Sequence, residues 1–159
     1  MEFERAVGKR TFDIVAPVEG KVVQLFELQD EVFRNKIVGD GLAIEPSNGL
    51  FMAPISGTVV HVARTRHSIL IKADEKLTIM VHMGLDTVYL EGVAFKCFVT
   101  EGQNVKCGDV LAKMNLEEVL RREKKIVTPI ILVENKEARL KKTNQLFVNK
   151  YDMLFTVIL

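Results

Sequence analysis

Short runs of aliphatic and β-branched residues recur along the chain at roughly 8–12-residue spacing, separated by clusters of Gly, Pro, Asn and Asp. Strand-length apolar runs with turn residues between them are typical of antiparallel β-structure. We therefore expect an all-β fold, an antiparallel β-sandwich or barrel with one or two short helices. Residues 1–11 carry charges along most of their length and are predicted to form a flexible N-terminal tail, which leaves residues 12–159 as a single domain.

Two pairs of segments repeat within the chain. The sequence APVEGKVV at residues 16–23 returns as APISGTVV at residues 53–60. A second echo pairs VGDGLA at 38–43 with CGDVLA at 107–112, and in each case a Gly-Asp turn leads into an apolar strand. These repeats predict an internally duplicated β scaffold.

One short helix is predicted after residue 115. Asn115 can cap its N-terminus, Glu117 and Glu118 would lie in its first turn, and Lys124 and Lys125 would lie at its end, as the helix dipole favours. Its apolar stripe would consist of Leu116, Val119 and Leu120.

Composition and charge exclude several classes of protein. The chain is 48% hydrophobic and 27% charged, with a formal net charge of +1, so no strong field attracts nucleic acid or anionic lipid. Its apolar runs are far shorter than the roughly 18 residues that cross a bilayer, and its N-terminus does not resemble a signal peptide. We therefore expect a cytoplasmic protein without membrane insertion, in which Cys97 and Cys107 stay free thiols.

Two of the three histidines belong to a predicted hairpin. Two apolar runs between residues 63 and 90 are joined by the polar stretch 73–76, which indicates two antiparallel strands. If the hairpin turns at Asp74-Glu75, His67 lies directly opposite His82, with Cβ atoms ~4.5–5.5 Å apart. A longer or bulged turn would shift this register by one residue and place the two rings on a diagonal or on opposite faces.

Two facing neutral imidazoles suit phosphoryl chemistry. One ring can act as a nucleophile when its other nitrogen is held protonated, for example by a backbone carbonyl, and the second can stabilise phosphoryl oxygens. Thr65 could hydrogen-bond the His67 ring or the phosphoryl group. Gly84 would leave an opening beside His82 for the backbone of a partner, and Asp86 would place a carboxylate at the rim.

The sequence gives no sign of a role for the third histidine or of a resident metal site. His61 stands alone and is expected to be a bystander, either on the surface or hydrogen-bonded in the core. A zinc site in a protein generally needs three or four ligands, and no third ligand is evident near His67 and His82. We therefore expect no resident metal and no other cofactor, and zinc shared with a partner that supplies a carboxylate remains open as an alternative.

Longer motifs carry a family resemblance that covers nearly the whole chain. They are, in order, APVEGKVV, VFRNKIVGDGLAIEPSNG, APISGTVV, the T-x-H of residues 65–67, HMGLDTVYLEGVAF and EGQNVKCGDVLAKMN. Together they resemble the IIA domain of the glucose family of the bacterial phosphoenolpyruvate-dependent sugar phosphotransferase system. This resemblance implies the fold known as a duplicated hybrid motif.

The resemblance also implies a function and a set of site residues. His82, in H-x-G-x-D-T-V, would accept a phosphoryl group from phospho-HPr on its tele nitrogen and pass it to a cysteine on the IIB domain of a sugar permease. His67 would assist transfer without carrying the group, and the protein would act as a monomeric phosphotransferase component. An apolar patch that docks both partners in turn, with aspartates at its rim, would comprise Phe33, Ile37, Val38 and Leu70, with Asp30 and Asp86 at the rim.

The chain departs from the family pattern next to the threonine of T-x-H. The family usually has an aromatic residue two positions before this threonine, whereas here Ala63 holds that place and Arg64 and Arg66 flank Thr65. We therefore expect a docking patch that is smaller and more basic in this region, which leaves the preference for partners open. The sugar is also open, because permeases for glucose, N-acetylglucosamine, sucrose, trehalose and β-glucosides use such domains.

A different class of protein shares part of the histidine motif. H-x-G-x-D, read alone at residues 82–86, also opens the zinc site of peptidoglycan endopeptidases built on a related β scaffold. Those enzymes need a later H-x-H, and no histidine follows His82, so the third ligand and the catalytic base are missing. A biotinyl- or lipoyl-like carrier would need a modifiable lysine at a tight turn between its repeats, and no convincing candidate occurs.

Overall fold

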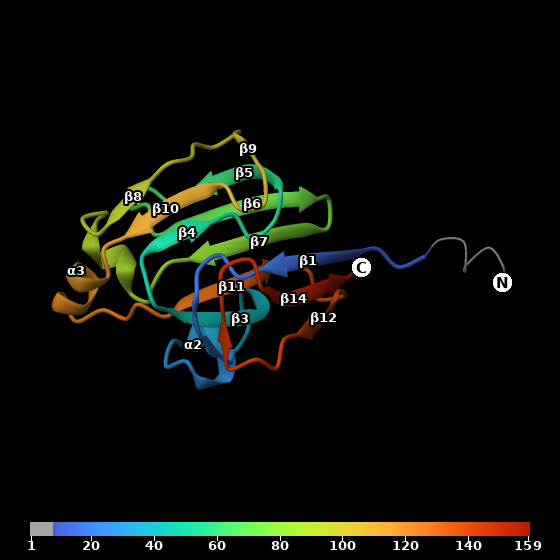
Figure 1. The fold of residues 1–159 in the computed structure, drawn as a ribbon, viewed down its shortest axis with the longest axis horizontal. Coiled ribbons are helices and arrows are strands. Elements are labelled where there is room, and N and C mark those ends of the chain that lie inside the picture. Colours follow the sequence, from blue (N-terminus) through green and yellow to red (C-terminus); the bar gives the residue numbers. More distant parts are fainter. Residues whose placement is uncertain (1–7) are drawn as a thin grey trace.

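The computed structural model describes residues 8–159, and antiparallel strands dominate it (Figure 1). Two α-helices, α2 (Glu31–Arg34) and α3 (Leu116–Arg121), and two 3-10 turns, η1 (Leu25–Glu27) and η2 (Thr87–Leu90), interrupt the strands. The strands are β1 (Thr11–Val15), β2 (Gly20–Val23), β3 (Gly39–Pro46), β4 (Leu50–Met52), β5 (Gly57–Val62), β6 (Ser68–Asp74), β7 (Leu77–His82), β8 (Phe95–Cys97), β9 (Asn104–Val105), β10 (Val110–Met114), β11 (Thr128–Val133), β12 (Arg139–Lys142), β13 (Phe147–Val148) and β14 (Met153–Ile158).

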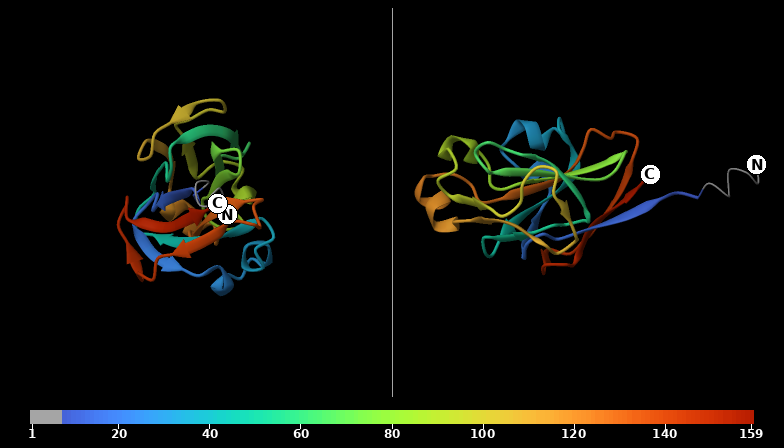
Figure 2. Two further views of the ribbon diagram at one scale, coloured as in Figure 1. Left: turned by 90° about the vertical axis from the view of Figure 1, so that its right-hand side faces the viewer. Right: turned by 90° about the horizontal axis from the view of Figure 1, so that it is seen from above.

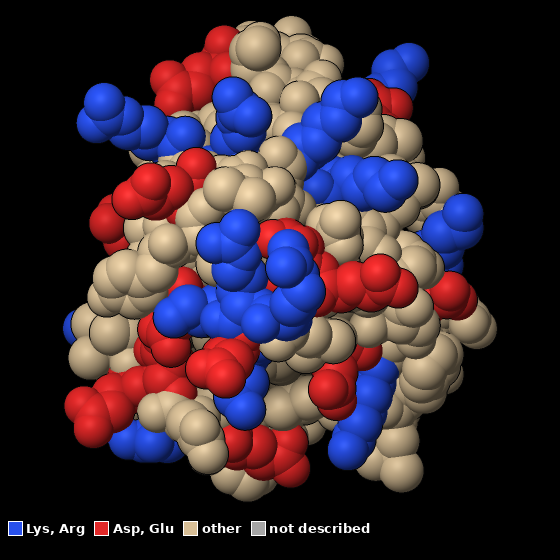
Figure 3. Space-filling view, turned by 90° about the vertical axis from the view of Figure 1, so that its left-hand side faces the viewer, with Lys and Arg blue, Asp and Glu red and all other residues tan. Residues whose placement is uncertain are grey.

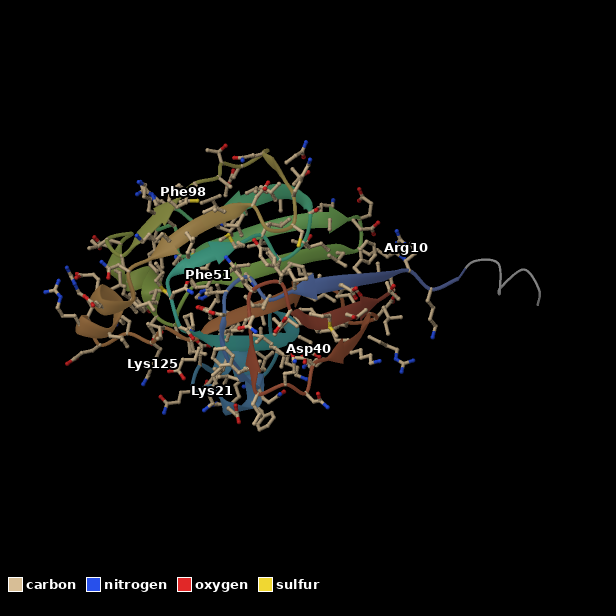
Figure 4. The ribbon with its side chains drawn as sticks, in the orientation of Figure 1. Arg10, Lys21, Asp40, Phe51, Phe98 and Lys125 are labelled. Atoms are coloured by element: carbon tan, nitrogen blue, oxygen red, sulfur yellow. The ribbon has the colours of Figure 1, made fainter. Side chains whose placement is uncertain are left out.

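These strands form three sheets around one main core. The largest is an eight-stranded sheet in the order β13-β2-β3-β11-β7-β6-β5-β9, and two three-stranded sheets, β1-β14-β12 and β4-β10-β8, complete the molecule (Figure 2). The large sheet stays open, with β13 and β9 as its two outer strands, so the fold is a sandwich and not a closed barrel. Phe51, in the centre of Figure 4, and Phe155 are the largest fully buried side chains of the core.

The first pair of repeated segments occupies equivalent places in the large sheet, as the predicted internal duplication requires, whereas the second pair is divided between β3 of the large sheet and β10 of a three-stranded sheet. Gly20 begins β2 and Gly57 begins β5, and each strand pairs with the next strand along the chain, β3 and β6 respectively. A Cβ atom on Gly20 would lie 2.1 Å from the carbonyl oxygen of Glu45, and one on Gly57 would lie 2.4 Å from that of Lys72. The neighbouring strand thus approaches so closely that both repeats need glycine.

Helix α3 forms where it was predicted. The Asn115 side chain caps it by accepting a hydrogen bond from the backbone N–H of Glu118 at 3.1 Å. The helix ends at Arg121, before the two lysines assigned to its end, and its apolar stripe is narrower than predicted. Val119 is fully buried but Leu120 is 54% exposed, because consecutive residues point about 100° apart around so short a helix. Among residues 8–159, no helix has the length and apolar character needed to cross a bilayer.

The ordered fold begins earlier than the predicted tail boundary. Residues 1–7 of that tail lie outside the described residues, but Thr11 already pairs with Ile158 as the first residue of β1. Arg10 forms an ion pair with Asp74 at 2.6 Å, and its carbonyl accepts a hydrogen bond from the N–H of Leu159 at 2.9 Å. The assignment of residues 10 and 11 to a free tail is therefore wrong, because both are held by strand β14 or by the β6–β7 hairpin.

The hairpin of β6 and β7 forms, but its register differs from the prediction by one residue. Ser68, and not His67, pairs with His82. The chain turns at residues 75–76 and not at the predicted Asp74-Glu75, so that Asp74 pairs with Leu77, and a bulge at Ala73 then offsets part of this change for every later pair. His67 lies just before β6, where its carbonyl accepts a hydrogen bond from the N–H of Met83 at 2.7 Å.

Candidate active site

The rings of His67 and His82 lie together at one end of the large sheet despite the shifted register. Their centroids are 4.9 Å apart, and the rings meet edge to face at 78°. The turn between β5 and β6 explains this arrangement. A 2.7 Å hydrogen bond from the N–H of Arg66 to the carbonyl of Ala63 closes the turn, and Arg66 has a left-handed backbone with φ 63°. A left-handed residue after such a turn redirects the next side chain, and His67 thereby meets His82 without being its strand partner.

The His82 ring has a fixed orientation and a defined tautomer. Its Nδ1 atom lies 2.8 Å from the carbonyl oxygen of Gly84. Because a carbonyl oxygen only accepts, Nδ1 carries the proton, and the lone pair is on Nε2, the tele nitrogen. Burial lowers the pKa of His82, although the Gly84 carbonyl and the charges of Asp30 and Asp86 oppose this shift. The ring is thus neutral at neutral pH, with an unprotonated Nε2.

Buried hydrogen bonds hold the loop of residues 83–87 that supplies the Gly84 carbonyl. The Thr128 hydroxyl oxygen accepts from the N–H of Gly84 at 3.3 Å, and the Thr87 hydroxyl donates to the carbonyl of Met83 at 2.6 Å. Both threonines are fully buried. Thr128 was missed in the sequence, where its signal is a polar residue within the apolar run 126–133.

Gly84 has a different role from the predicted one. It is buried, with φ +76°, and a Cβ atom there would lie 2.5 Å from Cγ2 of Thr87 and 2.6 Å from the carbonyl oxygen of Lys125. The space beside it is filled, so Gly84 does not leave an opening for a partner. Glycine is needed because the backbone is left-handed and crowded at the point where its carbonyl meets the His82 ring.

The His67 ring is held by a side chain rather than by the backbone. The Thr65 hydroxyl oxygen lies 2.6 Å from Nδ1 of His67, and Thr65 belongs to the β5–β6 turn and not to the strand that the sequence predicted. His67 is 9% exposed, and burial, together with the nearby His82 and His61, lowers its pKa to about 4. His67 is therefore also neutral at neutral pH.

Helix α2 places an aromatic ring against the histidine pair. The Asp30 carboxylate caps this helix by accepting from the N–H groups of Val32 and Phe33, at 2.9 and 3.2 Å. The cap fixes Phe33, whose ring centroid lies 4.9 Å from that of His82. Asp30 is thus both the predicted rim carboxylate and the residue that orients the helix.

The remaining residues of the predicted patch surround this ring on the same side. Ile37 is 67% exposed just after α2, and Val38 packs on the small cluster that contains Phe33. Leu70 lies half-buried on β6, directly opposite Met80 of β7. Met80 was not predicted, although strand periodicity gives the signal, because residues two apart on β7 share the face of His82.

The rim residues line a separate hollow beside the patch. Asp86 is exposed at the start of η2 with a left-handed backbone, φ 59°. It lines a hollow of about 670 Å³ together with Asp30, and the same hollow receives three glutamates. These are Glu27, Glu31 and Glu45.

The third histidine and the cysteines take no part in this arrangement. His61 lies on β5, half-exposed, with Nδ1 3.4 Å from a carboxylate oxygen of Glu101. Cys97 and Cys107 are both free thiols. Within the described range 8–159, no three or more His, Cys, Asp or Glu side chains are grouped to hold a metal ion. His67 and His82 could supply two nitrogens to a metal, which is fewer than a zinc site needs.

An open β-sandwich with two neutral, edge-to-face imidazoles beside an apolar patch is an arrangement suited to group transfer between docked partners. Residues 12–138 match the family described as phosphoenolpyruvate-dependent sugar phosphotransferase system, EIIA 1. The chain therefore belongs to this family.

Individual relatives support the assignment. The chain is 41% identical over 139 residues to the PTS system glucose-specific EIIA component of Bacillus cereus, covering 86% of this chain and 84% of that one. It is 38% identical over 141 residues to the protein of the same name from Staphylococcus aureus strain COL, covering 86% and 85%. The solved structure of glucose permease IIA from Mycoplasma capricolum matches with a TM-score of 0.87 at 35% identity, covering 92% and 96%.

Family membership confirms the resemblance seen in the motifs and settles the class of activity. The chain is an EIIA component of a sugar-transport phosphotransferase system, and phosphotransfer is its general activity. HPr and the IIB domain of a sugar permease are the partners that such a component implies.

Proposed function

We propose that Nε2 of His82 accepts a phosphoryl group from phospho-HPr and passes it to a cysteine of the IIB domain of a glucose-family permease. In the first step the Nε2 lone pair forms a bond to phosphorus as the bond between phosphorus and HPr breaks. In the second step a IIB thiolate forms an S–P bond, and the electron pair of the Nε2–P bond returns to Nε2. One observation carries the proposal: the hydrogen bond from His82 Nδ1 to the Gly84 carbonyl, which leaves the lone pair on Nε2.

His67 is suited to stabilise the phosphoryl group without carrying it. In the tautomer with its proton on Nε2, the Thr65 hydroxyl donates to Nδ1, and the Nε2–H group is free to donate to a phosphoryl oxygen. Donors held near the phosphoryl oxygens supply much of the catalysis in such transfers, because the chemistry needs mainly positioning and charge stabilisation.

The apolar patch gives both partners one place to dock. Phe33 and Met80 lie beside His82, and the exposed Ile37 extends the patch outward. A small patch with a charged rim favours weak, fast exchange, because little area is buried in each complex. We propose that HPr and IIB use this patch in turn and that the protein acts as a monomer.

Reconstitution tests the proposal directly. The purified chain is incubated with phosphoenolpyruvate, enzyme I and HPr, and the acid-labile phosphoryl group is located by mass mapping. We expect the label on His82 and no label on the His82→Ala variant, whereas His61→Ala should be labelled like the wild type. A labelled His82→Ala variant would contradict the mechanism.

A further inference from the structure

A hollow with basic walls lies on the side of the histidine pair formed by the β5–β6 turn. Arg64, Arg66 and Lys96 line this hollow of about 610 Å³, and all three side chains are exposed. None of them forms an ion pair with another residue of the described chain, 8–159. The single carboxylate in the lining, Glu101, lies 3.4 Å from the ring of His61. We call Arg64, Arg66 and Lys96 the basic rim.

The opposite side of the histidine pair has the reverse charge. The hollow that contains Asp30 and Asp86 is lined by five carboxylates and one lysine, Lys125. Figure 3 looks onto this end of the molecule and shows Lys and Arg side chains across its middle and upper part, interspersed with Asp and Glu. A partner that covers the histidines therefore meets acidic groups on one side and cations on the other.

The basic rim is anchored to the site itself. Arg64 and Arg66 flank Thr65, which hydrogen-bonds His67. Two backbone hydrogen bonds close the turn that carries them. One runs from the N–H of Arg66 to the carbonyl of Ala63, and the other, at 2.9 Å, runs from the N–H of Ala63 to the carbonyl of Ser68. The backbone that carries Arg64 and Arg66 is therefore held beside the residue that hydrogen-bonds His67.

We infer that the basic rim docks an acidic segment of the IIB domain and favours delivery of the phosphoryl group over its acceptance. This inference rests on the proposed function. The complex with IIB holds the phosphoryl group, with roughly two negative charges, and also the attacking thiolate, which has released its proton to solvent. The complex with HPr holds the same phosphoryl group without a thiolate. Cations at the edge lower the electrostatic cost most where the total negative charge is largest, which is the complex with IIB.

The test measures the two transfers separately. Phosphorylation of the chain by phospho-HPr gives the acceptance rate, and transfer from the phosphorylated chain to a purified IIB domain of a glucose-family permease gives the delivery rate. For the double variant Arg64→Glu/Arg66→Glu we expect kcat/KM of delivery to fall ~10-fold at low salt, with acceptance changed less than ~3-fold. The difference should shrink as salt is added.

A matched control lies at the other end of the molecule. Arg139→Glu/Lys141→Glu makes the same change in charge on exposed residues of β12 and should leave both rates unchanged (Figure 1). Equal losses in acceptance and delivery, no loss in delivery, or the same loss in the control pair would overturn the inference.

A charge-reversed IIB domain shows whether slow delivery by the Arg64→Glu/Arg66→Glu variant comes from weaker docking or from misfolding of that variant. A IIB variant in which exposed carboxylates near its cysteine are replaced by lysine should restore delivery from Arg64→Glu/Arg66→Glu, and failure to do so would also overturn the inference. If the wild-type chain takes no label on His82, it is the proposed function that fails, and the comparison of rim variants is not needed to show it.

Discussion

The two histidines are held by opposite kinds of structure. The loop of residues 83–87, which orients His82 through the Gly84 carbonyl, is mostly buried and is fixed by the hydroxyls of Thr87 and Thr128. The turn of residues 63–66, which orients His67, is largely exposed and holds the ring through one hydroxyl. A carbonyl can only accept, but a hydroxyl can donate or accept. The His82 ring therefore has one fixed tautomer, while the His67 ring can change its own.

The largest effect should come from crowding the buried loop. Gly84→Ala adds a Cβ atom into a left-handed, filled position, and we expect the free energy of unfolding to fall by about 3 kcal/mol, with acceptance from phospho-HPr strongly slowed. Urea unfolding and the labelling rate measure the two effects. Gly102→Ala is the matched control, because Gly102 is also left-handed, φ +90°, with nothing within 4 Å of the added atom. Equal losses in both variants would show that crowding at Gly84 is not the cause.

Removing the assisting ring should affect delivery alone. For His67→Gln we expect labelling by phospho-HPr close to that of the wild type and transfer to IIB slowed ~10²-fold, since a positioned donor to the phosphoryl oxygens is lost. Single-turnover rates of both steps measure this. His61→Gln should change neither rate, and unimpaired delivery by His67→Gln would remove His67 from the mechanism.

Lowering the pH should destabilise the folded protein mainly through His67, the ring that the turn of residues 63–66 orients. The pKa of His67 is about 4 in the folded protein against 6.5 for an unperturbed histidine, so the unfolded chain binds more protons between these values. The contribution of His67 to the free energy of unfolding is therefore complete well above pH 6.5 and falls by about 3 kcal/mol as the pH drops toward 4. Urea unfolding across this range measures the loss. In His67→Gln most of it should disappear, and an unchanged pH profile would assign the effect to other groups.

The smallest effect should come from the single buried hydroxyl that supports Gly84. Thr128→Val keeps the shape of the side chain but leaves the Gly84 N–H without its partner, and we expect about 1–2 kcal/mol of destabilisation and slower acceptance. Thr128→Ser keeps the hydroxyl and should accept the phosphoryl group at nearly the wild-type rate. If the valine and serine variants accept equally fast, Thr128 does not position the loop.

The sequence predicted those parts of the fold that depend on local chemistry. The paired glycines of the repeats and the Asn115 cap carry clear local signals, the two apolar runs predict the β6–β7 hairpin although its turn residues are not a strong signal, and each appears in the structure. The adjacency of His67 and His82 was also predicted, but for a reason that does not hold, because the strand register differs.

The remaining features depend on contacts between distant segments. Nothing around Ala73 marks it as a bulge, and an arginine at position 66 does not suggest a left-handed backbone. The hydrogen bond between Gly84 and Thr128 joins positions 44 residues apart in the chain, so it can be recognised only when β11 is known to lie beside β7. For the same reason, the filled space beside Gly84 could not be distinguished from an opening.

The contact between Arg10 and Leu159 determines how the domain responds to force. Both ordered ends leave the molecule at one place, far from the end that carries Lys125, as Figures 1 and 4 show. Pulling them apart would load the hydrogen bond between Arg10 and Leu159 first and then separate β1 from β14 one pair at a time, beginning with Thr11 and Ile158. The pairing of β1 with β14 would thus resist such a pull only weakly. A tether attached at one end would lie far from the histidines, which would leave the docking face of a surface-bound domain free.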